Sequence, residues 1–224
     1  MYYINEIQAY ASPIVGFFLS DGVPYETIKL ILFLPVIATF IAFLRQVVGI
    51  KAFGIYTPLL ITFAFLATNG LKYGIAIFVS VIIIGMLMRF ILKPFRLLYL
   101  PRVAIMLTVV AVLILGILTF GGNMKRTGLA SVSIFPILIM ITLVEKFITV
   151  QIEKGNKEAL YLAAETLIIS VAGFYAANLT FLIKIIITAP WVILLTIPIN
   201  IILGKWTGLR LSEYWRFKEI IKKM

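Results

Sequence analysis

The sequence predicts an all-α, polytopic membrane protein with seven transmembrane helices, and three observations predict it. Of the 224 residues, 62% are hydrophobic and only 13% are charged, with a mean hydropathy of +1.12. A water-soluble domain of this size could not bury so much apolar surface. Apolar stretches about 20 residues long, the length that crosses a bilayer, recur along the chain. Most lysines and arginines lie at the ends of these stretches, where lipid headgroups would lie.

The apolar stretches end at charged residues, glycines or prolines, and these punctuation points define the elements in order. The predicted spans are residues 28–48, 54–68, 72–92, 101–120, 129–147, 159–178 and 181–203. The apolar stretch at 11–19 is too short to span and predicts an interfacial segment. We therefore expect an extracytoplasmic or interfacial segment at 1–24, a seven-helix membrane domain at 25–206 and a cytoplasmic tail at 207–224.

The distribution of positive charge predicts the orientation of the chain. Lysines and arginines are concentrated in the first, third and fifth connections and in the C-terminal tail, and few lie on the other side. Under the positive-inside rule this bias predicts a protein of the bacterial inner membrane with its N-terminus outside the cell membrane and its C-terminus in the cytoplasm. The bias also favours an odd number of spans.

The tail LRLSEYWRFKEIIKK combines apolar and aromatic residues with basic ones at helical spacing. An amphipathic helix on the anionic inner leaflet is the favoured interpretation, and a helix that docks a protein partner is the alternative. The residues expected at the membrane surface are Arg210, Arg216, Lys218, Lys222 and Lys223.

The composition also argues against several functions. The chain has no cysteine and no histidine, so it lacks thiol nucleophiles, imidazole bases and the common zinc and haem ligands. No paired carboxylates, phosphate-binding loop or nucleophile elbow stands out. We therefore expect no enzyme activity, no metal and no cofactor. The net charge of +11 is explained by lipid headgroups, so nucleic acid is not an expected partner.

Two predicted spans carry a proline near their start and resemble each other. Aligning Pro58 with Pro136 places GIYTPLLIT over VSIFPILIM. Because the two segments are three spans apart, they would cross in opposite directions, as in a 3+3 inverted repeat with one additional helix.

A proline removes a backbone donor, so carbonyl groups near it become available close to membrane depth. Paired, interrupted segments of this kind point to a substrate path, whose side chains here would include Thr57, Ser131 and Ser133. The alternative is that both prolines are ordinary helix kinks, as Pro35, Pro190 and Pro198 would also be.

Ionisable residues inside spans are the second indication of function, because an isolated charge in the membrane is costly. Glu165 is the deepest acidic residue, and Glu145 lies near the cytoplasmic end of the fifth span. Arg45, Arg89 and Arg102 fall at the same level and could pair with them. The sequence leaves structural pairing and a functional role equally open for Glu165, and favours an interface role for Glu145.

The blocks RQVVGIKAFGIYTP, PRVAIMLT, SIFPILIMITLVEKF and EKGNKEAL resemble the bacterial seven-transmembrane domain usually fused to an inactive transglutaminase-like domain. The resemblance covers most of the chain from Pro24 onward. The proline-containing segments and PRVAIML show a weaker similarity to the small membrane subunit of poly-γ-glutamate synthases. Because the sequence offers no room before Tyr25 for a transglutaminase-like domain, we expect either a standalone version of the membrane domain or an excised membrane domain, and any function of the transglutaminase-like domain is not carried over.

The resemblance implies a non-enzymatic membrane partner of an ATP-grasp ligase that joins glutamate-type amino acids, often accompanied by a retropepsin-like protein. Three functions follow as expectations. The first is a scaffold or export conduit for such a ligase system, shaped by Pro58 and Pro136 with Glu165 as its polar contact. The second is an independent transporter or channel for a small solute, and the third is a structural anchor whose tail recruits a cytoplasmic partner.

Overall fold

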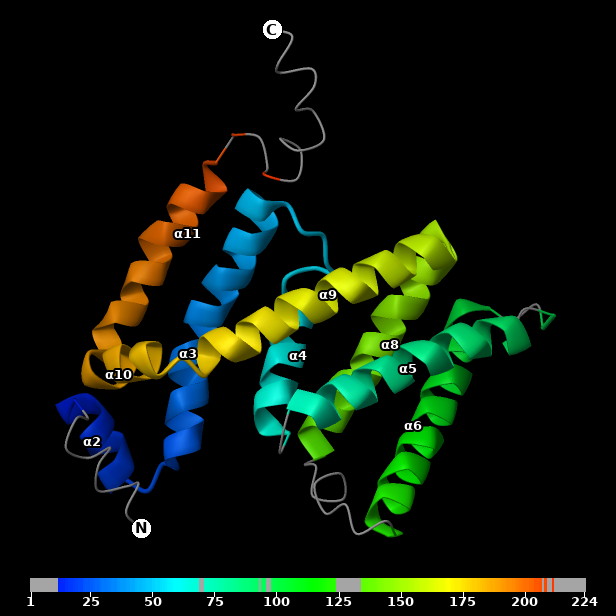
Figure 1. Cartoon of the computed structure of the whole chain (residues 1–224), viewed down its shortest axis with the longest axis horizontal. Coiled ribbons are helices and arrows are strands. Elements are labelled where there is room, and N and C mark those ends of the chain that lie inside the picture. Colours follow the sequence, from blue (N-terminus) through cyan, green and yellow to red (C-terminus); the bar gives the residue numbers. More distant parts are fainter. Residues whose placement is uncertain are drawn as a thin grey trace, which may run out of the picture. The chain divides into compact units, whose positions relative to one another are not determined.

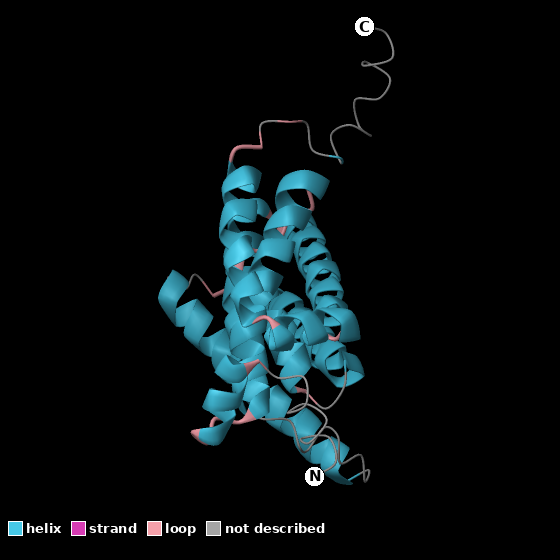
Figure 2. Ribbon diagram, turned by 90° about the vertical axis from the view of Figure 1, so that its left-hand side faces the viewer, coloured by secondary structure: helices cyan, strands magenta, loops and turns pink. Residues whose placement is uncertain are grey.

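The computed structural model of the chain is helical throughout the regular structure that it describes (Figures 1 and 2). The structure describes residues 12–68, 71–92, 94–95, 98–123, 134–206, 208 and 211. Its α-helices are α2 (Pro13–Ser20), α3 (Tyr25–Phe43), α4 (Tyr56–Ala67), α5 (Leu71–Leu92), α6 (Tyr99–Asn123), α8 (Ile134–Lys154), α9 (Asn156–Ala177), α10 (Thr180–Thr188) and α11 (Thr196–Gly204). A π-helical turn, η1 (Leu44–Val48), extends α3, and a 3-10 helix, η2 (Pro190–Leu195), precedes α11.

The chain divides into two compact units, and the division falls within α9. The first unit comprises residues 1–50 and 172–224, and the second comprises residues 51–171. In the second unit, α8 packs against α4, α5 and α6. Helices α4 and α8 run in opposite directions, as the order of colours in Figure 1 shows. Phe65, Leu143 and Phe147 are among the fully buried side chains of this unit.

The first unit is built on the pairing of α3 with α11. The Asn200 side-chain amide donates a hydrogen bond to Thr39 Oγ1 at 2.7 Å, and Thr39 Oγ1 donates to the Pro35 carbonyl at 2.8 Å. Helix α2 packs on α3, and Val15 joins Ile28 and Ile187 in a small buried cluster. These contacts tie the two ends of the membrane domain into one unit.

The distribution of side chains is the reverse of that in a soluble protein. Large apolar residues such as Ile31, Ile83 and Ile202 are more than half exposed, whereas polar Thr62 and Thr166 are 0% exposed. Exposed apolar surface is stable where lipid replaces water, and buried polar groups are then satisfied inside the bundle. The arrangement is that of a polytopic membrane protein.

The helix bounds follow most of the predicted spans, but fewer than seven of the described helices have the length and hydropathy expected of a full span. Among the described residues, Tyr25–Val48, Leu71–Leu92 and Asn156–Ala177 qualify, and α10 with the following helix would add a fourth if the bent pair is one span. Helix α4 has only 12 residues, or roughly 18 Å of length. Helix α8 is long enough but carries Glu145, Lys146, Glu153 and Lys154.

The last predicted span, 181–203, is not one straight helix. Thr180–Thr188 and Pro190–Gly204 meet at an angle of 105°. Ala189 leaves the helical conformation, with φ −134° and ψ 73°, because a residue before proline is sterically disfavoured in the α region. Pro190 therefore ends α10, whereas Pro198 lies within the uninterrupted helix α11.

Candidate functional site

A non-helical segment leads into the short helix α4. Gly49, with φ +87°, ends η1, and Gly54, with φ +72°, turns the chain into α4. Both angles lie in the left-handed region that glycine adopts without a steric penalty. Between them, Ala52 and Phe53 are buried, so this stretch of irregular backbone lies inside the second unit.

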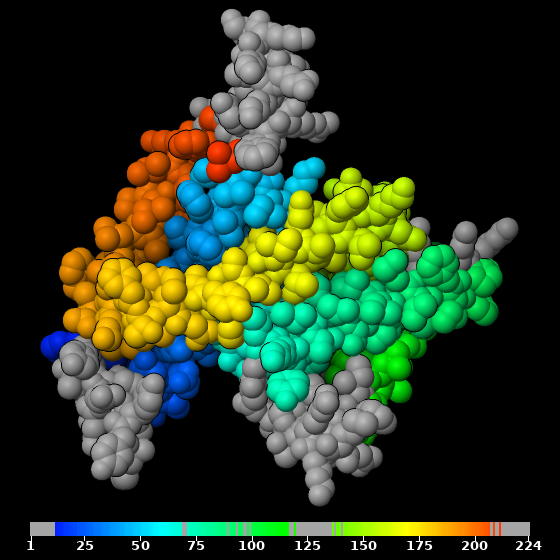
Figure 3. Space-filling model, viewed as in Figure 1, coloured from blue at the N-terminus to red at the C-terminus, as the bar shows by residue number. Residues whose placement is uncertain are grey.

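One side of α9 is lined by small residues, which lets other backbone segments approach closely. The buried residues at helical spacing are Ala159, Ala163, Thr166, Ser170, Gly173 and Ala177. The opposite side of the helix is exposed, as its yellow surface in Figure 3 shows, and carries Leu160, Tyr161 and Ile168. Small residues serve this purpose widely at helix interfaces in membranes.

Hydrogen bonds join this small-residue side of α9 to the irregular segment and to α4. The Phe53 N–H donates to Thr166 Oγ1 at 3.2 Å, and Thr166 Oγ1 donates to the Leu162 carbonyl at 2.6 Å. The Pro58 carbonyl lies 2.8 Å from Thr62 Oγ1 and 3.1 Å from Ser170 Oγ. We call Thr62, Thr166, Ser170 and the Pro58 carbonyl the polar seam.

The two remaining contacts of the polar seam close it into a network. Thr62 Oγ1 also lies 3.2 Å from the Ser170 carbonyl, and Ser170 Oγ lies 2.8 Å from the Thr166 carbonyl. A hydroxyl has one proton, so Thr62 and Ser170 can each donate to only one of their two acceptors at a time. Since all three side chains are 0% exposed, the network has alternative donor arrangements without contact with water.

Glu165 lies next to the seam and faces the irregular segment. Its carboxylate interacts with the backbone amide and the ammonium group of Lys51. The sequence left pairing with Arg45, Arg89 or Arg102 open, and the structure places the backbone N–H and the positive charge of Lys51, in the segment that precedes α4, near this carboxylate. Since Glu165 and Thr166 lie near the middle of the 22-residue helix α9, the irregular backbone from Lys51 to Phe53 reaches the middle of a candidate span.

Pro58 and Pro136 both lie near the first described residues of their helices. Pro58 is the third residue of α4, and Pro136 is the third residue of α8 as described; both are buried. A missing N–H is tolerated in the first turn, where backbone donors have no intrahelical acceptor. Helix α8 is continuous from Ile134 to Lys154, and the expected break at Pro136 stays a prediction because the backbone before Ile134 lies outside the described residues. The irregular backbone among the described residues of this unit precedes α4.

The other predicted path residues are placed as follows. Thr57 is half-buried in the first turn of α4, and Glu145 is half-buried on α8, where its carbonyl accepts from Thr149 Oγ1 at 2.8 Å. Ser131 and Ser133 lie outside the described residues, as do Arg210, Arg216, Lys218, Lys222 and Lys223. Of the predicted path residues that the structure describes, Pro58 and Glu165 lie at or beside the polar seam. Thr62, Thr166 and Ser170 were not predicted, although their spacing from Pro58 and along α9 is visible in the sequence.

Within the part of the chain that the structure describes, no group of three or more acidic, histidine or cysteine residues is placed to hold a metal ion. The chemistry available at the seam is hydrogen bonding by hydroxyl and carbonyl groups, with one carboxylate and one ammonium group beside it. Such a set can hold backbone in place or contact a polar solute.

Comparison with known proteins identifies a family. A family model described as seven transmembrane helices usually fused to an inactive transglutaminase matches residues 19–221. The match extends over nearly the whole chain. It confirms the resemblance to this seven-transmembrane family, and it does not show the weaker resemblance to poly-γ-glutamate synthases. No curated protein and no solved structure matches the chain.

Proposed function

Because the chain belongs to the family of seven-transmembrane-helix domains usually fused to an inactive transglutaminase, we propose that it is a non-enzymatic scaffold or export conduit. Its client is an ATP-grasp ligase that joins glutamate-type amino acids, with a retropepsin-like protein as an accessory partner. The sequence resemblance motivates the choice of ligase. The irregular backbone beside Glu165 at the middle of α9 carries the proposal of a conduit.

Irregular backbone at membrane depth supports a path for a physical reason. Its N–H and C=O groups cannot be satisfied by lipid, so such backbone occurs where protein buries it or where it lines a water-filled cavity. Discontinuous helices of this kind hold substrates and coupling ions in many transporters. Helix α4, with its 12 residues, is too short to cross a hydrocarbon core of about 30 Å by itself, so the preceding segment completes the crossing.

The proposal includes seven spans in the bacterial inner membrane, with the N-terminus outside and the C-terminus in the cytoplasm. It also includes an inverted repeat that relates α3–α5 to α6–α9, with the α10–α11 segment as the seventh span. The opposite directions of α4 and α8, and the matching positions of Pro58 and Pro136, support the repeat.

Single-cysteine labelling tests the orientation, because the chain contains no cysteine. We expect Asn178→Cys, an exposed position between α9 and α10, to react with a membrane-impermeant maleimide in intact spheroplasts. Lys205→Cys, an exposed position after α11, should react only after permeabilisation. The reverse pattern would refute the proposed orientation.

Export of ligase product tests the function. Cells that express the ligase system would carry Glu165→Gln or, as a matched control, Glu153→Gln at an exposed position on α8. A conduit predicts that Glu165→Gln lowers the amount of glutamyl product outside the cell at matched protein levels, while the ligase still co-purifies with the membrane protein. Equal export by both variants would remove Glu165 from the path, and loss of co-purification alone would favour a scaffold.

The antiparallel pairing of α4 and α8 favours a second candidate, an independent transporter of a small solute. Inverted arrangements of this kind support alternating access without a soluble partner. Solute flux by the purified protein in liposomes that lack the ligase would favour this candidate. Flux only when the ligase is added would favour the first.

A further inference from the structure

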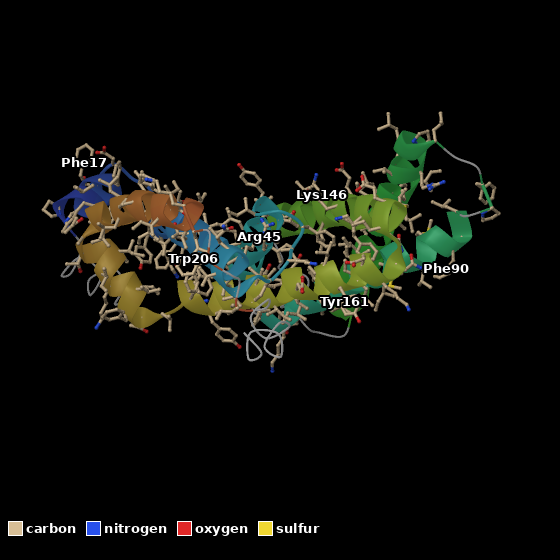
Figure 4. All side chains as sticks on the ribbon, turned by 90° about the horizontal axis from the view of Figure 1, so that it is seen from above. Phe17, Arg45, Phe90, Lys146, Tyr161 and Trp206 are labelled. Atoms are coloured by element: carbon tan, nitrogen blue, oxygen red, sulfur yellow. The ribbon has the colours of Figure 1, made fainter. Side chains whose placement is uncertain are left out.

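A cavity of about 230 Å³ lies within the second unit where the ends of α5 and α8 meet the starts of α6 and α9. Its described lining residues are Phe90, Leu92, Arg102, Met106, Ile148, Gln151, Ile152 and Asn156. Figure 4 labels one of them, Phe90, near the end of α5. None of the residues of the polar seam lines this cavity, so it is a separate site.

The lining combines one positive charge with amide groups and an apolar wall. Of the lining residues described, Arg102 alone is charged. The Nε of Arg102 and both polar side-chain atoms of Gln151 are buried, and Gln151 as a whole is 0% exposed. Phe90, Met106 and Ile148 supply apolar surface beside these groups. Partial shielding from bulk water strengthens the interaction of a guanidinium group with an anion.

We propose that this cavity binds a small anionic group, a carboxylate or a phosphate, through Arg102. The planar guanidinium group matches both acceptors with two parallel hydrogen bonds, and the amides of Gln151 and Asn156 can donate to the remaining oxygen atoms. The volume is below the roughly 300–1,000 Å³ of sites for drug-sized ligands, so the occupant is of amino-acid size or is the headgroup of a lipid.

The inference does not depend on the proposed function. Arg102 belongs to α6, Gln151 to α8 and Asn156 to α9, so the cavity exists in one unit whether or not the protein exports a ligase product. Its test therefore uses binding by the purified full-length chain and requires neither ligase nor export.

The experiment measures binding in nanodiscs of zwitterionic phosphatidylcholine by titration calorimetry, with glutamate and inorganic phosphate as separate probes. A second series replaces part of the lipid with anionic phosphatidylglycerol. Binding of glutamate or phosphate in zwitterionic discs would assign a soluble occupant. Saturable binding of phosphatidylglycerol would assign a lipid headgroup, whether it is observed without either probe or is displaced by one of them.

Three variants connect binding to the cavity. Arg102→Gln should weaken the anion that binds by about 10- to 100-fold, the range that corresponds to a hydrogen-bonded charged partner. Gln151→Glu, a nearly isosteric change, should weaken it comparably because a negative charge in the same cavity repels an anion. Lys146→Gln removes one positive charge from an exposed position on the same helix as Gln151 and should leave binding unchanged.

Two results would overturn the proposal. One is the absence of saturable binding of glutamate, phosphate and phosphatidylglycerol by the unmodified protein. The other is equal binding by Arg102→Gln and Lys146→Gln. If Arg102→Gln fails to fold, Gln151→Glu and the rise in the unfolding temperature of the unmodified protein with added probe decide the question.

Discussion

Thr166 on α9 accepts a hydrogen bond from the backbone N–H of Phe53 at 3.2 Å, across 113 residues of sequence. The contact connects the irregular segment before α4 with the middle of a candidate membrane span. It also provides an acceptor for the N–H of buried Phe53, which has no intrahelical acceptor because Phe53 precedes α4. In a membrane protein this bond stabilises a backbone conformation that lipid alone could not tolerate.

Thr166→Val tests the importance of that bond. The substitution keeps the shape of the side chain but leaves the Phe53 N–H without its acceptor, so the free energy of unfolding should fall by about 1–3 kcal/mol. Reversible unfolding in mild detergent measures the change. Thr142→Val is the matched control, because exposed Thr142 on α8 bonds only within its own helix, to the Leu138 carbonyl at 3.0 Å. A loss no larger than in the control would contradict the assigned role.

Thr62 and Ser170 should act as alternatives at the Pro58 carbonyl. Each hydroxyl lies within hydrogen-bonding distance of that oxygen, so removing one leaves the other in place. We expect Thr62→Val and Ser170→Ala to lower the free energy of unfolding by about 0.5–1.5 kcal/mol each. The double variant should lose more than the sum of the two, with a coupling of about 0.5–3 kcal/mol. Strict additivity in this double-mutant cycle would show that the two hydroxyls act independently and do not replace each other at the Pro58 carbonyl.

The positions of the helices could be predicted from the sequence because apolar length and local punctuation determine them. Gly49 and Gly54 flank the irregular segment, and Pro190 ends α10, as such residues do for local conformational reasons. The family resemblance depends on the same stretches, and the family match over residues 19–221 confirms it.

The candidate site could be predicted only in part, because its contacts join distant segments. Glu165 was singled out as an acidic residue inside a predicted span, but nothing local indicates that its carboxylate lies near the backbone N–H and the positive charge of Lys51. The polar seam was missed because threonine and serine also occur in membrane helices at positions where they have no special role. The expected break at Pro136 stays a prediction, because the backbone that precedes Ile134 lies outside the described residues.

Gly74 should be sensitive to any added side chain. A Cβ atom at this position of α5 would lie 2.5 Å from Phe65 Cδ1 on α4, and Phe65 is fully buried. We expect Gly74→Ala to lower the free energy of unfolding by about 1–3 kcal/mol through overpacking. Gly116→Ala, within α6 and with open space at its Cβ, should raise it by about 0.5–1 kcal/mol, as alanine favours the helix. Thermal unfolding of both variants in the same detergent compares them. Equal stabilisation by both substitutions would show that α4 and α5 do not pack as closely as the structure indicates.

Lys51 and Glu165 should be coupled in energy, and the coupling should be modest. Lys51 is exposed and Glu165 is half-buried, so the ammonium–carboxylate interaction is partly screened and should contribute about 0.2–1 kcal/mol in a cycle of Lys51→Gln, Glu165→Gln and the double variant. Added salt should reduce that coupling, because dissolved ions screen the interaction of a solvent-exposed charge more strongly as the ionic strength rises. The control cycle uses Lys146→Gln and Glu153→Gln, two exposed residues about two turns apart on α8, and should show no coupling. Lys51→Gln keeps the backbone N–H that Glu165 also contacts, so the side-chain contribution is isolated. If the Lys51 and Glu165 effects add without coupling at low salt, then the backbone amide alone holds the carboxylate, and the irregular segment is positioned by its main chain.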